Sequence, residues 1–198
     1  IYGCLVGSEM CIRDRGYPMA GYISKAGHNV TVFNRTAAKA DKWIGEYKGS
    51  KADTPSKAAE NADFIFTCVG NDNDLREVTF GENGIFKTVK KNAVYIDNTT
   101  ASATIAREIY DYAKKNNFGF LDAPVSGGQA GAENGALTVM IGGDQTDYDK
   151  ASPIIDCYSK KMKLLGKAGS GQLAKMVNQI CIAGLVPVSY THLTLPTM

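Results

Sequence analysis

Short apolar runs alternate with segments of helical periodicity along most of the chain. The apolar, β-branched runs that predict strands are 30–33, 64–69, 94–97 and 118–121. Between them, residues 37–46, 55–61 and 104–115 repeat apolar side chains every three or four positions, which is typical of amphipathic helices. This alternation predicts an α/β fold, a series of βαβ units that form a doubly wound and mainly parallel sheet.

The pattern changes in the last third of the chain. Two further strands are expected at 137–141 and 162–165, with an amphipathic helix at 147–157 between them. A last helix is expected after the glycine turn at 169–171. Its apolar stripe is broad enough to require burial against something beyond the sheet.

The two ends of the chain lack any such periodicity. Residues 6–14 can be back-translated into a DNA sequence that resembles a sequencing-library adapter. The reverse complement of that DNA sequence translates into residues 188–193. We therefore expect 1–15 and 187–198 to be translated adapter that adds nothing to the fold. The first strand of the βαβ series should then be damaged. What remains is an α/β domain over 16–166 and a helix over 169–186.

The composition indicates a soluble globular protein. Of 198 residues, 22 are Lys or Arg and 20 are Asp or Glu, so the net charge is +2, and 44% are hydrophobic. These values exclude a disordered chain and a polybasic nucleic-acid binder. No apolar run approaches the roughly 20 residues that span a bilayer, and no signal peptide is evident, so we expect a cytoplasmic protein without nucleic-acid or membrane partners.

Cysteine and histidine offer little support for a metal site or a disulfide framework. The five cysteines form no C-x-x-C pair, and the chain has two histidines. We expect no metal. Cys68, Cys157 and Cys181 are interpreted as small core residues.

A dinucleotide normally binds at the carboxyl ends of such strands, against a G-x-G-x-x-G turn. Only the last glycine, Gly16, is visible, because the first two positions fall on Cys11 and Arg13. Taken alone, Gly16 is better explained as a structural glycine before a helix. Arg35 stands where NAD-binding proteins place an acidic residue, and its guanidinium favours the 2′-phosphate of NADP. A solvated surface arginine explains that position as well.

Several motifs occur together, and the most informative is the glycine-rich run over 122–143. The others are Gly16-Tyr-Pro-Met-Ala-Gly, Asn34-Arg-Thr, Asp97-Asn-Thr-Thr and Gly169-x-Gly-x-x-x-Lys175-x-x-Asn178. With them the chain resembles the β-hydroxyacid dehydrogenases, which include 3-hydroxyisobutyrate dehydrogenase and tartronate semialdehyde reductase. The resemblance implies hydride transfer between NADP, or NAD, and a small 3-hydroxy carboxylate. It also implies that 16–166 is a Rossmann-type dinucleotide-binding domain and that 169–186 begins a long interdomain helix. A helical second domain, which this chain lacks, and a homo-oligomeric full-length form are implied as well.

The resemblance further implies roles for individual residues. Ser126, Gly127 and Gly128 would hold the substrate carboxylate, and Lys175 would be the catalytic acid and base, with Asn178 orienting the amine or the substrate. The cofactor would contact Gly16, Met19, Asn34, Arg35, Thr36, Val69, Gly70 and Thr100. The alternatives are a glycine-rich turn between strands and a solvated surface lysine. As a fragment, the chain is expected to be inactive.

Two other functions remain open. One is a binding module of the same family that recognises a partner without catalysis, and the other is a different Rossmann reductase that acts on an imine or a sugar phosphate. Retention of Lys175 and Asn178 favours an enzyme. Because Lys175-Met-Val-Asn178 lacks the histidine typical of phosphogluconate dehydrogenases, a small hydroxyacid is favoured over a sugar phosphate.

Overall fold

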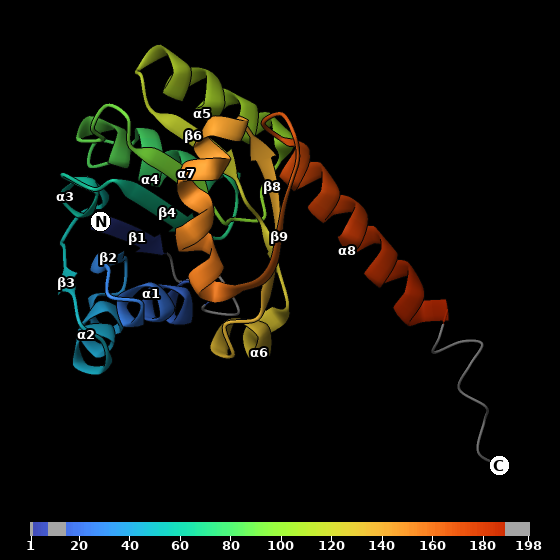
Figure 1. Cartoon of the computed structure of the whole chain (residues 1–198), viewed down its shortest axis with the longest axis horizontal. Coiled ribbons are helices and arrows are strands. Elements are labelled where there is room, and N and C mark those ends of the chain that lie inside the picture. Colours follow the sequence, from blue (N-terminus) through green and yellow to red (C-terminus); the bar gives the residue numbers. More distant parts are fainter. Residues whose placement is uncertain (1, 8–14, 189–198) are drawn as a thin grey trace.

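A computed structural model of the chain describes residues 2–7 and 15–188 as one twisted sheet with helices on both faces (Figure 1). The strand order is β3-β2-β1-β4-β5-β6-β8-β7, with β9 paired to β8. The strands are β1 Tyr2–Gly7, β2 Asn29–Asn34, β3 Ser50–Lys51, β4 Phe64–Cys68, β5 Val94–Asp97, β6 Gly119–Asp122, β7 Val125–Ser126, β8 Leu137–Gly143 and β9 Ser159–Gly166.

The sheet is mainly parallel, which confirms the predicted fold class. Strands β1 to β6 pair in parallel, whereas β8 runs antiparallel to β6 and β7. The chain passes from β1 outward to β2 and β3, and then returns to place β4 on the other side of β1. The strand order therefore reverses between β1 and β4, which is where ligands bind in doubly wound sheets.

The prediction that residues 1–15 add nothing to the fold is wrong. Tyr2–Gly7 forms the central strand β1, paired with β2 from Tyr2↔Asn29 to Gly7↔Asn34 and with β4 from Gly3↔Phe64 to Gly7↔Cys68. The run is short and mostly apolar, which suffices for a parallel strand enclosed by two neighbours. Its suspected origin from an adapter stays a prediction. Cys11 and Arg13 lie outside the described residues.

The helices divide between the two faces of the sheet. One core cluster includes side chains of α1, α2 and α7, and the other includes side chains of α3, α4 and α5. Neighbouring strand residues alternate between the clusters, with Phe66 in the first and Ile65 in the second. The helices are α1 Gly16–Lys25, α2 Ala37–Glu46, α3 Pro55–Ala59, α4 Asp72–Phe80, α5 Ala103–Lys115, α6 Gly128–Glu133, α7 Gln145–Ile155 and α8 Ser170–Val188, with 3₁₀ turns at Ile85–Lys87 and Asp156–Tyr158.

The predicted strands and helices lie where the apolar pattern placed them, within one to three residues at most boundaries. Helix α4 was not predicted, because only Leu75 and Thr79 of its nine residues are buried. Its first turn is held instead by Asn71, whose side-chain oxygen accepts the N–H groups of Asn73 and Asp74 at 2.9 and 3.0 Å.

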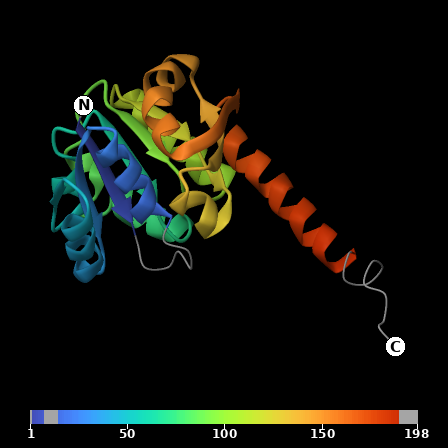
Figure 2. The ribbon, with the colours of Figure 1, turned by 60° about the horizontal axis from the view of Figure 1, so that its bottom comes forward.

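Helix α8 leaves the body of the domain and projects away from the sheet, as Figures 1 and 2 both show. Its apolar side chains beyond the first turns are exposed, including Val177 at 61% and Ile180 at 68%. Cys181 is also exposed, so its interpretation as a core residue is wrong, whereas Cys68 is buried as predicted. The correction follows from the position of Cys181 on the projecting part of the helix.

The described residues contain neither a metal-binding cluster nor a membrane-spanning helix. Within residues 2–7 and 15–188, no group of three or more His, Cys, Asp and Glu side chains is arranged to hold a metal ion. No helix in the same ranges has the length and apolar character needed to cross a membrane.

Candidate active site at the carboxyl edge of the sheet

The parallel strands end together along one edge of the sheet. Register pairs Gly7 with Asn34 and with Cys68, and pairs Asp97 with Thr67 and with Asp122. The segments that follow these strand ends therefore converge on one edge. They carry most of the residues predicted for the site, namely Asn34, Arg35, Thr36, Val69, Gly70, Thr100 and Ser126.

Lys175 lies on the buried side of α8 near this edge. Its exposure is 5%, which is rare for a lysine. Burial, and next the positive charge of Arg15, lowers the pKa of its amine below the ordinary value of 10.5. The sequence alternative, a solvated surface lysine, is therefore wrong for this position. The lowered pKa increases the neutral fraction of the amine, which is the form that accepts a proton.

Arg15 connects the surroundings of Lys175 to the glycine turn. Its guanidinium Nη1 donates to the carbonyl oxygen of Val125 at 3.3 Å, directly before Ser126. The same charge acts on the Lys175 amine. Sequence reasoning missed Arg15 because it set the first fifteen residues aside.

Asn178 follows Lys175 by three positions, which places both on one side of the helix. Its side chain is half-buried, and its Oδ1 atom is buried without a hydrogen-bond partner among the described residues. Buried polar atoms in folded proteins normally have such a partner. The free acceptor is consistent with an amide that serves a bound molecule or the neighbouring amine.

The turn after β7 depends on its two glycines. Gly127 has φ +137° and Gly128 has φ +65°, and backbone of this kind favours glycine because it lacks a Cβ atom. Ser126 closes β7, and Gly128 opens the short helix α6. The sequence did not predict α6, and the carboxylate-binding role of Ser126, Gly127 and Gly128 stays a prediction.

Two buried carboxyl groups end neighbouring strands, and sequence reasoning did not select either. Burial raises the pKa of Asp97 to about 7, partly opposed by hydrogen bonds from Thr99 and Thr67. Burial also raises the pKa of Asp122 to about 6, opposed by backbone N–H groups of Gly169 and Gln172. An acidic residue directly after an apolar run was the available signal for both positions.

The oxygens of Asp97 are unequally partnered. Its Oδ1 accepts from the Thr67 hydroxyl at 2.9 Å and from the Thr99 N–H at 3.0 Å, whereas its Oδ2 is buried with no partner in the described structure. An ionised carboxylate would leave charge on an atom without a donor. The geometry therefore fits a group that keeps its proton over much of the acidic range.

The β2 side of the edge is more open. Asn34 accepts the Thr36 N–H at 2.9 Å, and the Arg35 side chain between them is 47% exposed. Arg35 lies 3.8 Å from the carboxylate of Asp74. A cavity of about 330 Å³ adjoins these side chains, and Phe33, Pro55, Glu77, Val78 and Glu82 also line it. This volume is at the lower end of the range for small-molecule sites, about 300–1,000 Å³.

The remaining residues predicted to contact the cofactor lie either along the carboxyl edge or in the core. Gly16 begins α1, and Val69, Gly70 and Thr100 lie in the loops after β4 and β5, where the Val69 N–H donates to Thr99 Oγ1 at 3.1 Å. Met19 is fully buried in the core, so its side chain supports the start of α1 and does not line the edge.

The chain is similar to known oxidoreductases and to a dehydrogenase domain. Residues 14–166 match the family described as the NAD binding domain of 6-phosphogluconate dehydrogenase. The chain is 61% identical over 171 residues to an uncharacterized oxidoreductase of Shewanella frigidimarina, covering 86% of this chain and 59% of that protein. It is 40% identical over 183 residues to a probable mitochondrial 3-hydroxyisobutyrate dehydrogenase-like protein of Arabidopsis thaliana, covering 89% and 54%.

A solved structure has the same fold. The 3-hydroxyisobutyrate dehydrogenase of Mycobacterium tuberculosis, determined with L-serine, aligns with a TM-score of 0.81 and 27% identity, covering 96% of this chain and 66% of that one. The chain thus spans between about half and two thirds of the length of the proteins it resembles.

Proposed function

The chain belongs to the family of the NAD-binding domain of 6-phosphogluconate dehydrogenase, and we propose that the complete protein is an NAD(P)-dependent dehydrogenase of small 3-hydroxy carboxylates. Relatives named as 3-hydroxyisobutyrate dehydrogenases support this substrate class. The proposal rests on one observation: Lys175 is buried, and burial together with the charge of Arg15 lowers the pKa of its amine.

Residues at the carboxyl edge are suited to hold the dinucleotide. The buried N-terminus of α1 at Gly16, the loop after β4 and the open cavity beside Arg35 lie around the point where the strand order reverses. The loop after β5 lies one strand farther along the same edge. When bound, the nicotinamide supplies or accepts the hydride. The protein's own groups must then bind the substrate carboxylate and transfer the proton of the substrate hydroxyl.

Lys175 would transfer this proton. In the oxidative direction the neutral amine takes the proton of the substrate hydroxyl, and in the reductive direction the ammonium returns it to the developing alkoxide. A lowered pKa makes both forms accessible nearer neutral pH. The turn Ser126-Gly127-Gly128 would bind the substrate carboxylate through its hydroxyl and backbone N–H groups, with Arg15 adding positive charge beside it.

We further propose NADP as the preferred cofactor. Arg35 follows β2, where a 2′-phosphate would lie, and its guanidinium is half exposed. Its ion pair with Asp74 is long, and surface pairs of this kind contribute roughly 0–1 kcal/mol. A doubly charged phosphate could therefore replace Asp74 as the partner of Arg35 at small cost.

The test uses the complete protein with NADP and a series of small 3-hydroxy carboxylates. Lys175→Ala should lower kcat by about 10²–10⁴-fold, the range for loss of a general acid or base. The exposed Lys167, just before α8, provides a control, and Lys167→Ala should leave kcat within about 2-fold. Undiminished turnover in Lys175→Ala would exclude the role of the amine, and oxidation of no hydroxyacid by the unmodified protein would exclude the function.

A further inference from the structure

We propose that Asp122 and Gln172 are positioning residues, which fix the first turn of α8 and thereby hold the Lys175 amine inside the site. The inference rests on the proposed function in one respect, namely that Lys175 is the group whose placement matters. How the helix is attached to the sheet can be tested without turnover.

Asp122 binds the start of α8 with both of its carboxylate oxygens. Its Oδ1 accepts the Gly169 N–H at 2.7 Å, and its Oδ2 accepts the Gln172 N–H at 2.9 Å. The side chain is fully buried at the end of β6. N–H groups in the first turn of a helix have no partner within the helix, so an anionic acceptor there is strongly favoured.

Gln172 attaches the same turn to a second strand end. Its Oε1 accepts the Ala101 N–H at 3.0 Å, and its Nε2 donates to the Thr99 carbonyl oxygen at 2.7 Å. The side chain is fully buried, and its amide uses both ends on the loop between β5 and α5. Lys175 follows by three residues and lies on the same side of the helix.

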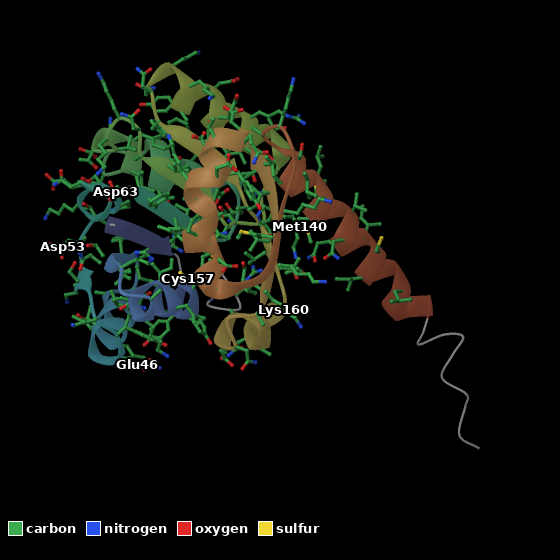
Figure 3. All side chains as sticks on the ribbon, viewed as in Figure 1. Glu46, Asp53, Asp63, Met140, Cys157 and Lys160 are labelled. Atoms are coloured by element: carbon green, nitrogen blue, oxygen red, sulfur yellow. The ribbon has the colours of Figure 1, made fainter. Side chains whose placement is uncertain are left out.

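Close packing of backbone against backbone leaves the turn little freedom. A Cβ atom at Gly171 would lie 2.4 Å from the Met140 carbonyl oxygen, and one at Gly142 would lie 2.5 Å from Asp122 Oδ1. Met140 stands on β8 beside the beginning of α8 (Figure 3). The helix therefore meets the sheet at contact distance, in the register that the two side chains set.

Farther along, α8 gains little support within the described residues. Met176 and Val177, directly after Lys175, are 47% and 61% exposed, and the helix continues away from the domain (Figure 2). Apart from the half-buried Asn178, packing after Lys175 therefore contributes little to the placement of its amine in this domain. The anchoring turn before it must fix the amine.

The experiment uses the complete protein and measures the amine of Lys175 directly. Competitive labelling with acetic anhydride at a series of pH values, followed by peptide mass spectrometry, reports the pKa and the reactivity of that lysine. In Asp122→Asn one acceptor becomes an N–H₂ donor facing an N–H group, and in Gln172→Met both amide bonds are lost. In each variant we expect the pKa of Lys175 to rise toward its ordinary value, because water reaches the amine.

Asp147→Asn is the matched control. Asp147 is also buried and accepts a backbone N–H, that of Phe120 at 3.3 Å, but it does so at the opposite end of β6. Its variant should leave the labelling of Lys175 unchanged. Where turnover is measurable, Asp122→Asn and Gln172→Met should lower kcat by on the order of 10²-fold, while KM for the cofactor changes less than about 3-fold.

Each outcome decides the proposal. A folded Asp122→Asn or Gln172→Met protein with the Lys175 pKa of the unmodified protein would overturn it, as would an equal change in Asp147→Asn. Should Asp122→Asn fail to fold, Gln172→Met gives the decision. If labelling shifts as expected but the unmodified protein oxidises no hydroxyacid, the positioning role holds and the proposed function fails.

Discussion

The two sides of the carboxyl edge are built in opposite ways. Around β5, β6 and the start of α8, polar groups such as Asp97, Asp122 and Gln172 are fully buried, and side-chain hydrogen bonds hold them in place. Beside β2, the half-exposed Arg35 has a long ion pair with Asp74 and faces an open cavity. We call these the buried side and the open side.

The two sides are suited to two different tasks, control of protonation on the buried side and recognition of a ligand on the open side. A buried amine can have its pKa shifted, because water does not compensate for the lost hydration, whereas an exposed guanidinium acts through charge and shape alone. Substitutions on the buried side should therefore change stability and protonation. Those on the open side should change only the choice of ligand.

The largest effect should come from Asp97. Because burial raises its pKa to about 7, the folded protein keeps a proton that the unfolded chain loses near pH 3.8. Stability from this group is thus complete below about pH 4 and is lost as pH rises through about 7, by on the order of 4 kcal/mol in total. Asp97→Asn should remove this slope, since the amide mimics the neutral acid.

Chemical denaturation of both proteins from pH 4.5 to pH 8 measures the difference in slope. Asp122 and Asp147, whose pKa values burial also raises, remain in both proteins, so their own contributions to the slope are largely shared. Identical slopes in the two proteins would show that Asp97 ionises normally, and the distinction between the two sides would then lose its electrostatic basis.

A smaller effect is expected from Gly171, where the buried side is tested sterically. A Cβ atom there would meet backbone oxygens of Met140 and Asp122 at 2.4 and 2.7 Å, so Gly171→Ala should lower the free energy of unfolding by about 1–3 kcal/mol. Gly184 lies on the same helix with nothing within 4 Å of its added Cβ atom. Gly184→Ala should stabilise the protein by at most about 1 kcal/mol. Equal losses in the two variants would contradict the close attachment of α8.

The smallest effects belong to the open side. Arg35→Ala should weaken NADP binding about 10-fold, equivalent to about 1.4 kcal/mol, and leave NAD binding and protein stability nearly unchanged. Asp74→Asn should act in the opposite direction, by about 2- to 3-fold, because it frees Arg35 and removes a negative charge. Calorimetric titration with both cofactors is the measurement. A parallel loss of NAD affinity in Arg35→Ala would refute the 2′-phosphate assignment.

The fold was largely accessible from the sequence because buried parallel strands and crossover helices leave strong apolar periodicity. Strand β5 over 94–97 and helix α2 over 37–46 coincide with their predicted limits. Helix α4 was missed because it has few buried residues and therefore little apolar periodicity. Hydrogen bonds to the Asn71 side chain hold its first turn instead. Strand β1 was missed for another reason. The DNA-level resemblance of residues 6–14 led us to exclude the whole segment 1–15, although residues 2–7 suit a strand.

The site was less accessible because its properties arise from tertiary burial. The motif around Lys175 could be read from the sequence, but the burial of its amine depends on how Gly171 and Gly142 bring α8 against the sheet. The raised pKa of Asp122 likewise exists only because β6 ends beneath that helix. No spacing in the sequence reports such a contact.

In the proposed reaction, the amine of Lys175 and the turn over 126–128 act on one substrate molecule. A crystal structure of the complete protein with its cofactor and a 3-hydroxy carboxylate would show whether both contact it. We predict that Nζ of Lys175 lies within hydrogen-bond distance, about 2.6–3.2 Å, of the substrate hydroxyl, while the carboxylate contacts Ser126 and the following glycines. A substrate bound at this edge with the amine directed away from it would contradict the account.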